Sequence, residues 1–120
     1  MYDFRRFYID GTWIQPSSRP ELDVIDPATE EPVGKISLGS AEDVDAAVKA
    51  ARQAFESFAE TSKQERIALL ERILKIFERR IGDVARAISD EMGAPMRFAR
   101  HAQAESGREH LMTAIEVLKK

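Results

Sequence analysis

An apolar stripe at helical spacing, between Ser62 and Gly93, constrains the fold of this chain more than any other feature. Its members recur every three or four residues, as in one face of an α-helix: Ile67, Leu70, Leu74, Phe77, Ile81, Val84, Ile88 and Met92. Such a face is stable only when another apolar surface covers it. The stretch therefore predicts a long amphipathic helix that packs against a partner.

Both ends of this stretch carry helix-terminus signals. Ser62 with Glu65 three positions later is the pattern of a capping box, and Gly93-Ala94-Pro95 supplies residues that end a helix. Inside the stretch, Gly82 is followed by Asp83. Because Gly ends helices and Asp caps new ones, this pair predicts a break or a kink.

The residues before the long helix predict a small antiparallel β-structure. Asp10-Gly11 favours a two-residue turn in a hairpin over residues 6–15. Residues 22–25 and 33–37 are expected to form two further strands, joined by a turn that begins at Asp26-Pro27. Because a few short strands bury little apolar surface, we expect them to need support from other elements.

A second amphipathic helix is predicted between these strands and the long helix. Ser40 and Asp43 form another capping box, and apolar residues keep helical spacing from Val44 to Phe58. The link at residues 60–62 is short. We therefore expect this helix and the long one to be antiparallel neighbours.

The pattern after Pro95 is less regular. Phe98 and its neighbours suggest a short helical piece, Ser106-Gly107 a soft interruption, and the residues from Leu111 onward a final helix. The helical pattern is still running at Lys120, with no capping glycine or proline. We therefore expect the protein to continue past this residue.

These elements together predict an α+β fold. The antiparallel hairpin and meander occupy residues 1–39, and antiparallel amphipathic helices occupy residues 40–120. A chain of 120 residues forms one domain at most. We interpret it as a single truncated domain.

Composition narrows the class of protein. The chain has 18 Lys and Arg against 21 Asp and Glu, and the basic residues are spread among the acids, which argues against nucleic-acid or membrane-surface binding. It has no cysteine, and hence no disulfide, thiolate metal site or cysteine nucleophile. No apolar run is long enough for a membrane span and no signal peptide is visible. We expect a cytoplasmic protein.

The residue types that often carry chemistry have structural explanations here. His101 and His110 lack a Cys, Asp or Glu at a recognised metal-ligand spacing. Asp10 and Asp26 lie in predicted turns, where Asp is favoured because its side chain bonds the backbone. The six glycines form no phosphate-binding loop. The residues alone predict no catalytic, cofactor-binding or metal site.

Several groups of residues nevertheless occur in a characteristic order along nearly the whole chain. They are 7–13 (Phe-Tyr-Ile-Asp-Gly-Thr-Trp), 24–29 followed by 34–36, 40–48 followed by Ala51, Ala54 and Phe55, Glu65-Arg66 with Leu69-Leu70 and Ile73, and 91–95 (Glu-Met-Gly-Ala-Pro). In this order they resemble the N-terminal region of the NAD(P)-dependent aldehyde dehydrogenase superfamily. The chain departs from that family at Phe58 and Ala94, where many members carry Trp and Lys.

The resemblance implies an enzyme that oxidises an aldehyde to a carboxylic acid through a cysteine thiohemiacetal, with NAD or NADP as cofactor. The cysteine nucleophile, glutamate base and oxyanion-hole asparagine of the family all lie after this region, as do its cofactor-binding residues. We therefore expect residues 1–120 to be a structural segment that is inactive alone and binds no cofactor.

The same resemblance suggests where this segment meets the substrate. In the family the final helical region helps to line the substrate entrance, which makes Gln103, Ser106 and Gly107 the candidate lining residues. The alternative explanation for these residues is a plain turn between helices.

Two kinds of partner follow from these expectations. The resemblance implies the remainder of the dehydrogenase chain, and the uncovered apolar stripes favour a homo-oligomer. The alternative function is a self-standing helical interaction module without enzymatic activity. Neither hypothesis includes nucleic acid or membrane as a partner.

Overall fold

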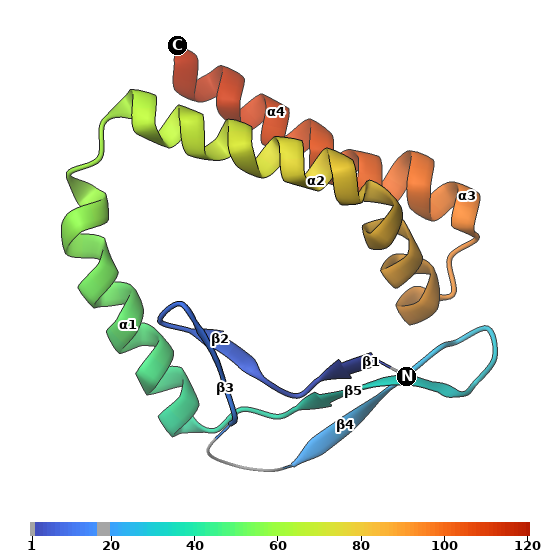
Figure 1. Ribbon diagram of the computed structural model, residues 1–120. Helices are drawn as coiled ribbons and strands as arrows, with labels where there is room; N and C mark the ends of the chain where they lie inside the picture. The colour runs from blue at the N-terminus through green and yellow to red at the C-terminus, as the bar shows by residue number, and fades with distance from the viewer. Residues whose placement is uncertain (1, 17–19) are drawn as a thin grey trace. The chain divides into compact units, whose positions relative to one another are not determined.

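The computed structural model describes residues 2–16 and 20–120, shown as a ribbon in Figure 1. They divide into two compact units, Met1–Glu60 and Thr61–Lys120. The first unit holds strands β1 to β5 and helix α1, and the second holds the remaining helices. Short strands followed by helices confirm the predicted α+β class.

A three-stranded sheet in the order β1-β5-β4 forms the larger part of the first unit's β-structure. Strands β4 (Glu21–Ile25) and β5 (Pro32–Ser37) pair antiparallel, as predicted. Strand β1 (Tyr2–Phe4) pairs parallel to β5, with Tyr2 opposite Gly34. The sequence did not predict β1, because three residues show no readable alternation and a parallel partner is distant in sequence.

The predicted hairpin is confirmed and consists of β2 (Phe7–Ile9) and β3 (Thr12–Ile14). Both turn residues have positive φ, 51° at Asp10 and 75° at Gly11, as a two-residue hairpin turn of this type requires. Tyr8 and Trp13 are cross-strand partners with ring centroids 5.2 Å apart. The hairpin is thus fixed by its turn and by one aromatic pair.

Helix α1 (Ala41–Ala59) begins at the predicted capping box. The backbone N–H of Ser40 donates to Asp43 Oδ2 at 2.9 Å, and the N–H of Asp43 donates to Ser40 Oγ at 3.3 Å. The apolar stripe of the helix is exposed in the structure. Its exposed members are Val44, Val48, Phe55 and Phe58.

Helix α2 (Lys63–Met92) is a single helix of 30 residues. It begins at the predicted capping box of Ser62 and Glu65 and ends at Gly93, whose φ of 67° is left-handed. Of the break or kink predicted at Gly82-Asp83, the break is wrong, because the helix continues through both residues. Figure 1 shows α2 changing direction toward its C-terminal end while remaining helical. Buried Ala85 and its partly buried neighbours hold the following turn in place, so the glycine does not end the helix.

Three helical segments follow without a loop between them. They are α3 (Met96–Phe98), the π-helix η1 (Ala99–Ala104) and α4 (Glu105–Lys119). The predicted interruption at Ser106-Gly107 is wrong, since both residues lie inside α4. The irregularity occurs earlier, as a π-helical stretch that sequence patterns do not indicate.

Helices α2 and α4 pack antiparallel within the second unit. Lys119 Nζ lies 2.8 Å from Glu71 Oε1 near one end, and Arg108 Nη1 lies 3.9 Å from Glu78 Oε1 farther along. Antiparallel amphipathic helices are therefore present, as predicted. The expected pairing of α1 with α2 concerns two different units and stays a prediction.

The core of the second unit is small and built from alanines. Ala85 on α2 and Ala99 and Ala104 on η1 are 0%, 0% and 1% exposed. Among the described residues no large side chain is fully buried. None of the helices within residues 2–16 and 20–120 is both long and apolar enough to span a membrane.

Candidate functional site

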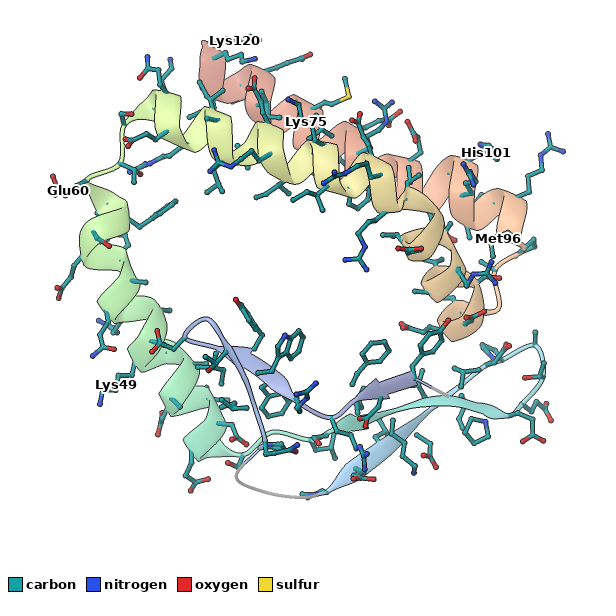
Figure 2. The ribbon with its side chains drawn as sticks, viewed as in Figure 1. Lys49, Glu60, Lys75, Met96, His101 and Lys120 are labelled. Carbon is teal, nitrogen blue, oxygen red and sulfur yellow. The ribbon has the colours of Figure 1, made fainter. Side chains whose placement is uncertain are left out.

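The three candidate entrance residues lie around the junction of η1 and α4. Gln103 is in the last turn of η1, and Ser106 and Gly107 are in the first turn of α4. All three are partly buried. In Figure 2 the labelled residues Met96 and His101 mark this end of the second unit. The structure therefore places the candidates in one continuous helix rather than in a turn between helices.

The π-helix η1 is the unusual backbone feature of this junction. A π-helix has a wider turn than an α-helix, is rare, and occurs mostly as single-turn insertions, frequently at functional sites. Here it begins and ends with the buried residues Ala99 and Ala104. Alanine lets the backbone of η1 approach α2 closely, where Ala85 is also fully buried. The wide turn is thus held by close backbone packing on one side.

Gln103 holds its amide group in an environment with few polar partners. Its Nε2 lies 4.0 Å from Met92 Sδ, a weak acceptor. Its Oε1 is buried and has no hydrogen-bond partner among the described residues. Buried polar atoms are nearly always paired, so this oxygen stands out.

Gly107 lies where α4 packs closely against Phe77 of α2. A Cβ atom built on Gly107 would lie 2.9 Å from Cζ of Phe77, closer than real Cβ atoms come to a neighbour. The Phe77 ring therefore occupies the space that a side chain at position 107 would need. Glycine is present here for packing, and the sequence pattern alone suggested an interruption instead.

Charged groups flank the junction on its α4 side. Arg108 Nε donates a short hydrogen bond to Glu105 Oε1, and Arg108 Nη1 lies 3.9 Å from Glu78 Oε1 on α2. This guanidinium therefore connects α4 to α2 next to Gly107. On the other side, a shallow depression of about 350 Å³ is lined by residues of α3, η1 and the preceding loop. They are Pro95, Arg97, Phe98, His101 and Ala102.

Asp10 and Asp26 have the turn roles that the sequence indicated. Asp26 Oδ1 accepts a hydrogen bond from the N–H of Ala28 at 2.8 Å, and Asp10 has the positive φ of its turn. His101 and His110 are exposed on helices. Within residues 2–16 and 20–120, no three His, Cys, Asp or Glu side chains are grouped as metal ligands.

The N-termini of the two long helices do not offer a site for a phosphate-containing cofactor. Free backbone N–H groups at a helix N-terminus are the usual place where proteins bind phosphate. In α1 and in α2 the first turn is occupied by the chain's own serine and acidic side chain. The acidic groups there would also repel phosphate. The first turns of α1 and α2 are therefore occupied by groups of the chain itself.

Comparisons with known proteins identify the family. The family model described as the aldehyde dehydrogenase family matches residues 13–120. The chain is 48% identical over 120 residues to 3-succinoylsemialdehyde-pyridine dehydrogenase from a Pseudomonas species, covering 99% of this chain and 25% of that protein.

Solved structures agree with the sequence comparison. A crystal structure of aldehyde dehydrogenase from Bartonella henselae matches with a TM-score of 0.97 and 46% identity, covering 99% of this chain and 25% of that one. A mutant of aldehyde dehydrogenase C from Pseudomonas syringae, in complex with NAD+ and octanal, matches with a TM-score of 0.94 and 42% identity, covering 97% of this chain and 24% of that one.

The chain therefore belongs to the aldehyde dehydrogenase family, as the order of its motifs predicted. It spans about a quarter of the length of the relatives it matches and corresponds to an N-terminal segment of them.

Sequence reasoning missed two features of the junction, the π-helix and the contact of Phe77 with Gly107. The small residues Ala85, Ala99, Ala104 and Gly107 were the available signal. It was ambiguous, because alanine is equally common on exposed helix faces.

Proposed function

We propose that this chain is the structural N-terminal segment of an enzyme that oxidises an aldehyde to a carboxylic acid with NAD or NADP. The observation that carries the proposal is the family match over residues 13–120 in a chain a quarter as long as its relatives. The nucleophile and the cofactor-binding residues then lie in the remainder of the enzyme. The absence of cysteine in these 120 residues and the occupied N-termini of α1 and α2 support this division of roles.

In the whole enzyme, the segment has two tasks. Residues 1–39 and 40–120 form part of one larger dinucleotide-binding domain, and the remainder of the chain covers the exposed stripe of α1, in which Val44 and Phe55 are 59% and 66% exposed. Gln103, Ser106 and Gly107 line the substrate entrance. Partial burial at the junction of η1 and α4 supports this role, because a lining residue must be both held in place and reachable.

The test compares the 120-residue chain with the longest gene product that contains it. Intact mass gives the length of the natural polypeptide, and NADH or NADPH formation is followed with an aliphatic aldehyde such as octanal and a ring-bearing semialdehyde. We expect aldehyde-dependent NAD(P)H formation by the long product and none by the short chain. Activity of the short chain, or no activity of the long product with any aldehyde, would contradict the proposal.

The alternative function, a self-standing interaction module, draws on the same exposed stripe of α1. We infer that in the isolated chain a second copy covers this stripe, because large apolar patches favour association. Light scattering of the purified chain checks this expectation. A monomer at high concentration would argue against self-association.

We propose a cytoplasmic location, supported by the lack of cysteine.

A further inference from the structure

The three-stranded sheet β1-β5-β4 has two chemically different faces. Residues that are partners in the strand register point to the same face of a sheet. A Cβ atom built on Gly34 would lie 3.2 Å from Cβ of its partner Tyr2, as this rule requires. One face therefore consists only of aromatic and aliphatic residues and a glycine. We call it the apolar sheet face, and its residues are Tyr2, Phe4, Leu22, Val24, Gly34 and Ile36.

The opposite face is charged, and its charges are paired. Lys35 Nζ lies 2.6 Å from Asp23 Oδ1. Arg5 Nη2 lies 2.8 Å from Asp3 Oδ2, and Arg5 Nη1 lies 3.2 Å from Glu21 Oε1. A sheet with one polar and one apolar face commonly turns the polar face to water and packs the apolar face on a protein core. The alternation along these strands is therefore that of a sheet covered on one side.

The apolar sheet face is nevertheless open to solvent in this segment. Phe4 and Leu22 are 54% and 53% exposed. The ring of Tyr2 stacks on that of Phe4 with 5.6 Å between the centroids, so the two rings form a continuous aromatic surface on β1. A sheet of a few short strands is marginally stable unless its apolar face packs against another element. The face therefore requires a partner.

The size of the face limits what this partner can be. Three strands about 4.8 Å apart, of about five residues at about 3.3 Å each, present a face of roughly 200 Å². A stable complex of two separate proteins buries about 800 Å² on each of them. The face is thus too small to hold a second copy of the chain by itself. A partner in the same polypeptide needs less area, because its packing does not cost the translational and rotational freedom of a separate molecule.

The length of the relatives supplies such a partner. The fold of this segment matches that of an aldehyde dehydrogenase of which it covers a quarter, so the same conformation occurs within a much longer chain. We infer that the part of the enzyme that follows this segment packs on the apolar sheet face and covers Phe4 and Leu22. The charged face remains in water. This inference rests on the proposed function and names a surface that holds the segment in the enzyme.

The test introduces a carboxylate on the apolar sheet face with Leu22→Glu. Urea unfolding is measured in the 120-residue chain and in the longest gene product that contains it. In the short chain the carboxylate is in water, so we expect the ratio of folded to unfolded protein to change by less than about threefold. In the long product the carboxylate is buried without a partner, so we expect this ratio to fall by at least about a hundredfold.

Asp23→Asn is the matched control, because Asp23 is next to Leu22 on β4 but lies on the charged face. Its ion pair with Lys35 is exposed, and exposed ion pairs contribute little to stability. We therefore expect the folded-to-unfolded ratio to change by about fivefold at most, and equally in both proteins.

Equal loss of stability in both Leu22→Glu proteins would mean that the face is covered within the 120 residues, and loss in neither would mean that it stays open. Either result overturns the inference. If the long Leu22→Glu variant does not fold, hydroxyl-radical labelling of the two wild-type proteins decides. Phe4 and Leu22 must then be labelled more slowly in the long product, and equal labelling overturns the inference.

The proposed function can fail separately from this inference. A long product that folds but oxidises no aldehyde refutes the enzymatic function, while the unfolding and labelling comparisons still decide whether the face is covered. A long product that oxidises aldehydes but leaves Phe4 and Leu22 exposed overturns only the inference. A natural polypeptide of 120 residues overturns both.

Discussion

Two glycines of the long helical region are expected to respond to the same substitution with opposite signs. Gly93 ends α2 with φ at 67°, and its N–H donates to the carbonyl of Ser89 at 2.9 Å. Gly82 lies within the helix, where an added methyl group would have space and would meet only Arg100 Nη1. The backbone conformation at each position decides what alanine does there.

The magnitudes follow from backbone preferences. In a helix interior alanine is about 1 kcal/mol more favourable than glycine, so Gly82→Ala is expected to raise the free energy of unfolding by about that amount. A non-glycine residue in the left-handed region costs about 1–2 kcal/mol, so Gly93→Ala is expected to lower it. The two variants then differ by roughly 2–3 kcal/mol. For a unit of this size, each kcal/mol shifts the melting temperature by about 4–8 °C.

Thermal unfolding of the 120-residue chain, followed by its helical circular dichroism, measures both shifts. Gly93→Asn is the control, because asparagine tolerates the left-handed region and should lose less stability than alanine does. The reasoning is refuted if Gly82→Ala melts below the wild type. It is also refuted if Gly93→Ala and Gly93→Asn both melt with the wild type.

Three further predictions concern helix ends, pH and packing. Ser62→Ala is expected to lower stability by about 1 kcal/mol because the N–H of Glu65 loses its acceptor, whereas Ser62→Asp retains one; urea unfolding checks both variants. A hydrogen bond from Lys119 lowers the pKa of Glu71. The pair therefore stabilises the fold at pH values above the ordinary pKa of glutamate. This stabilisation is lost as the pH falls through the lowered pKa. The free energy of unfolding, measured against pH, should fall less on acidification in Lys119→Gln than in the wild type. Identical pH profiles of the two proteins would contradict this role of the pair. Ala85→Leu is expected to lower the free energy of unfolding by about 1–3 kcal/mol, because the larger side chain overpacks the core. A melting temperature equal to that of the wild type would show that the core rearranges to accommodate leucine.

Helix and hairpin ends were the parts of the fold that the sequence predicted best. The capping boxes at Ser40 and Ser62, the stop at Gly93 and the turn at Asp10-Gly11 all occur where expected. Each depends on hydrogen bonds or dihedral angles within a few residues. Neighbouring residues therefore contain the information needed to locate them.

The predictions that failed concern positions where packing overrides a local preference. Gly82 lowers helix propensity, yet α2 continues through it because the following turn packs against η1. Gly107 has the appearance of an interruption, yet it lies inside α4 because Phe77 needs the space. Strand β1 is held by a parallel partner more than 30 residues away in the chain.

The candidate site divides in the same way. The order of motifs was enough to predict the family and to name Gln103, Ser106 and Gly107. It did not reveal the π-helix that bears Gln103 or the enclosed state of its Oε1. Both depend on how closely α2 and η1 approach each other, which no short stretch of sequence specifies.

The sequence by itself determined the class of fold, the ends of the two long helices and the family, because these follow from hydrophobic period, capping chemistry and the order of short motifs. Only the tertiary structure decided that α2 is unbroken, that η1 is a π-helix and that Gly107 is a packing position. The physical reason is that the contact free energy of Phe77, Ala85 and their neighbours across two helices outweighs the preferences of single residues.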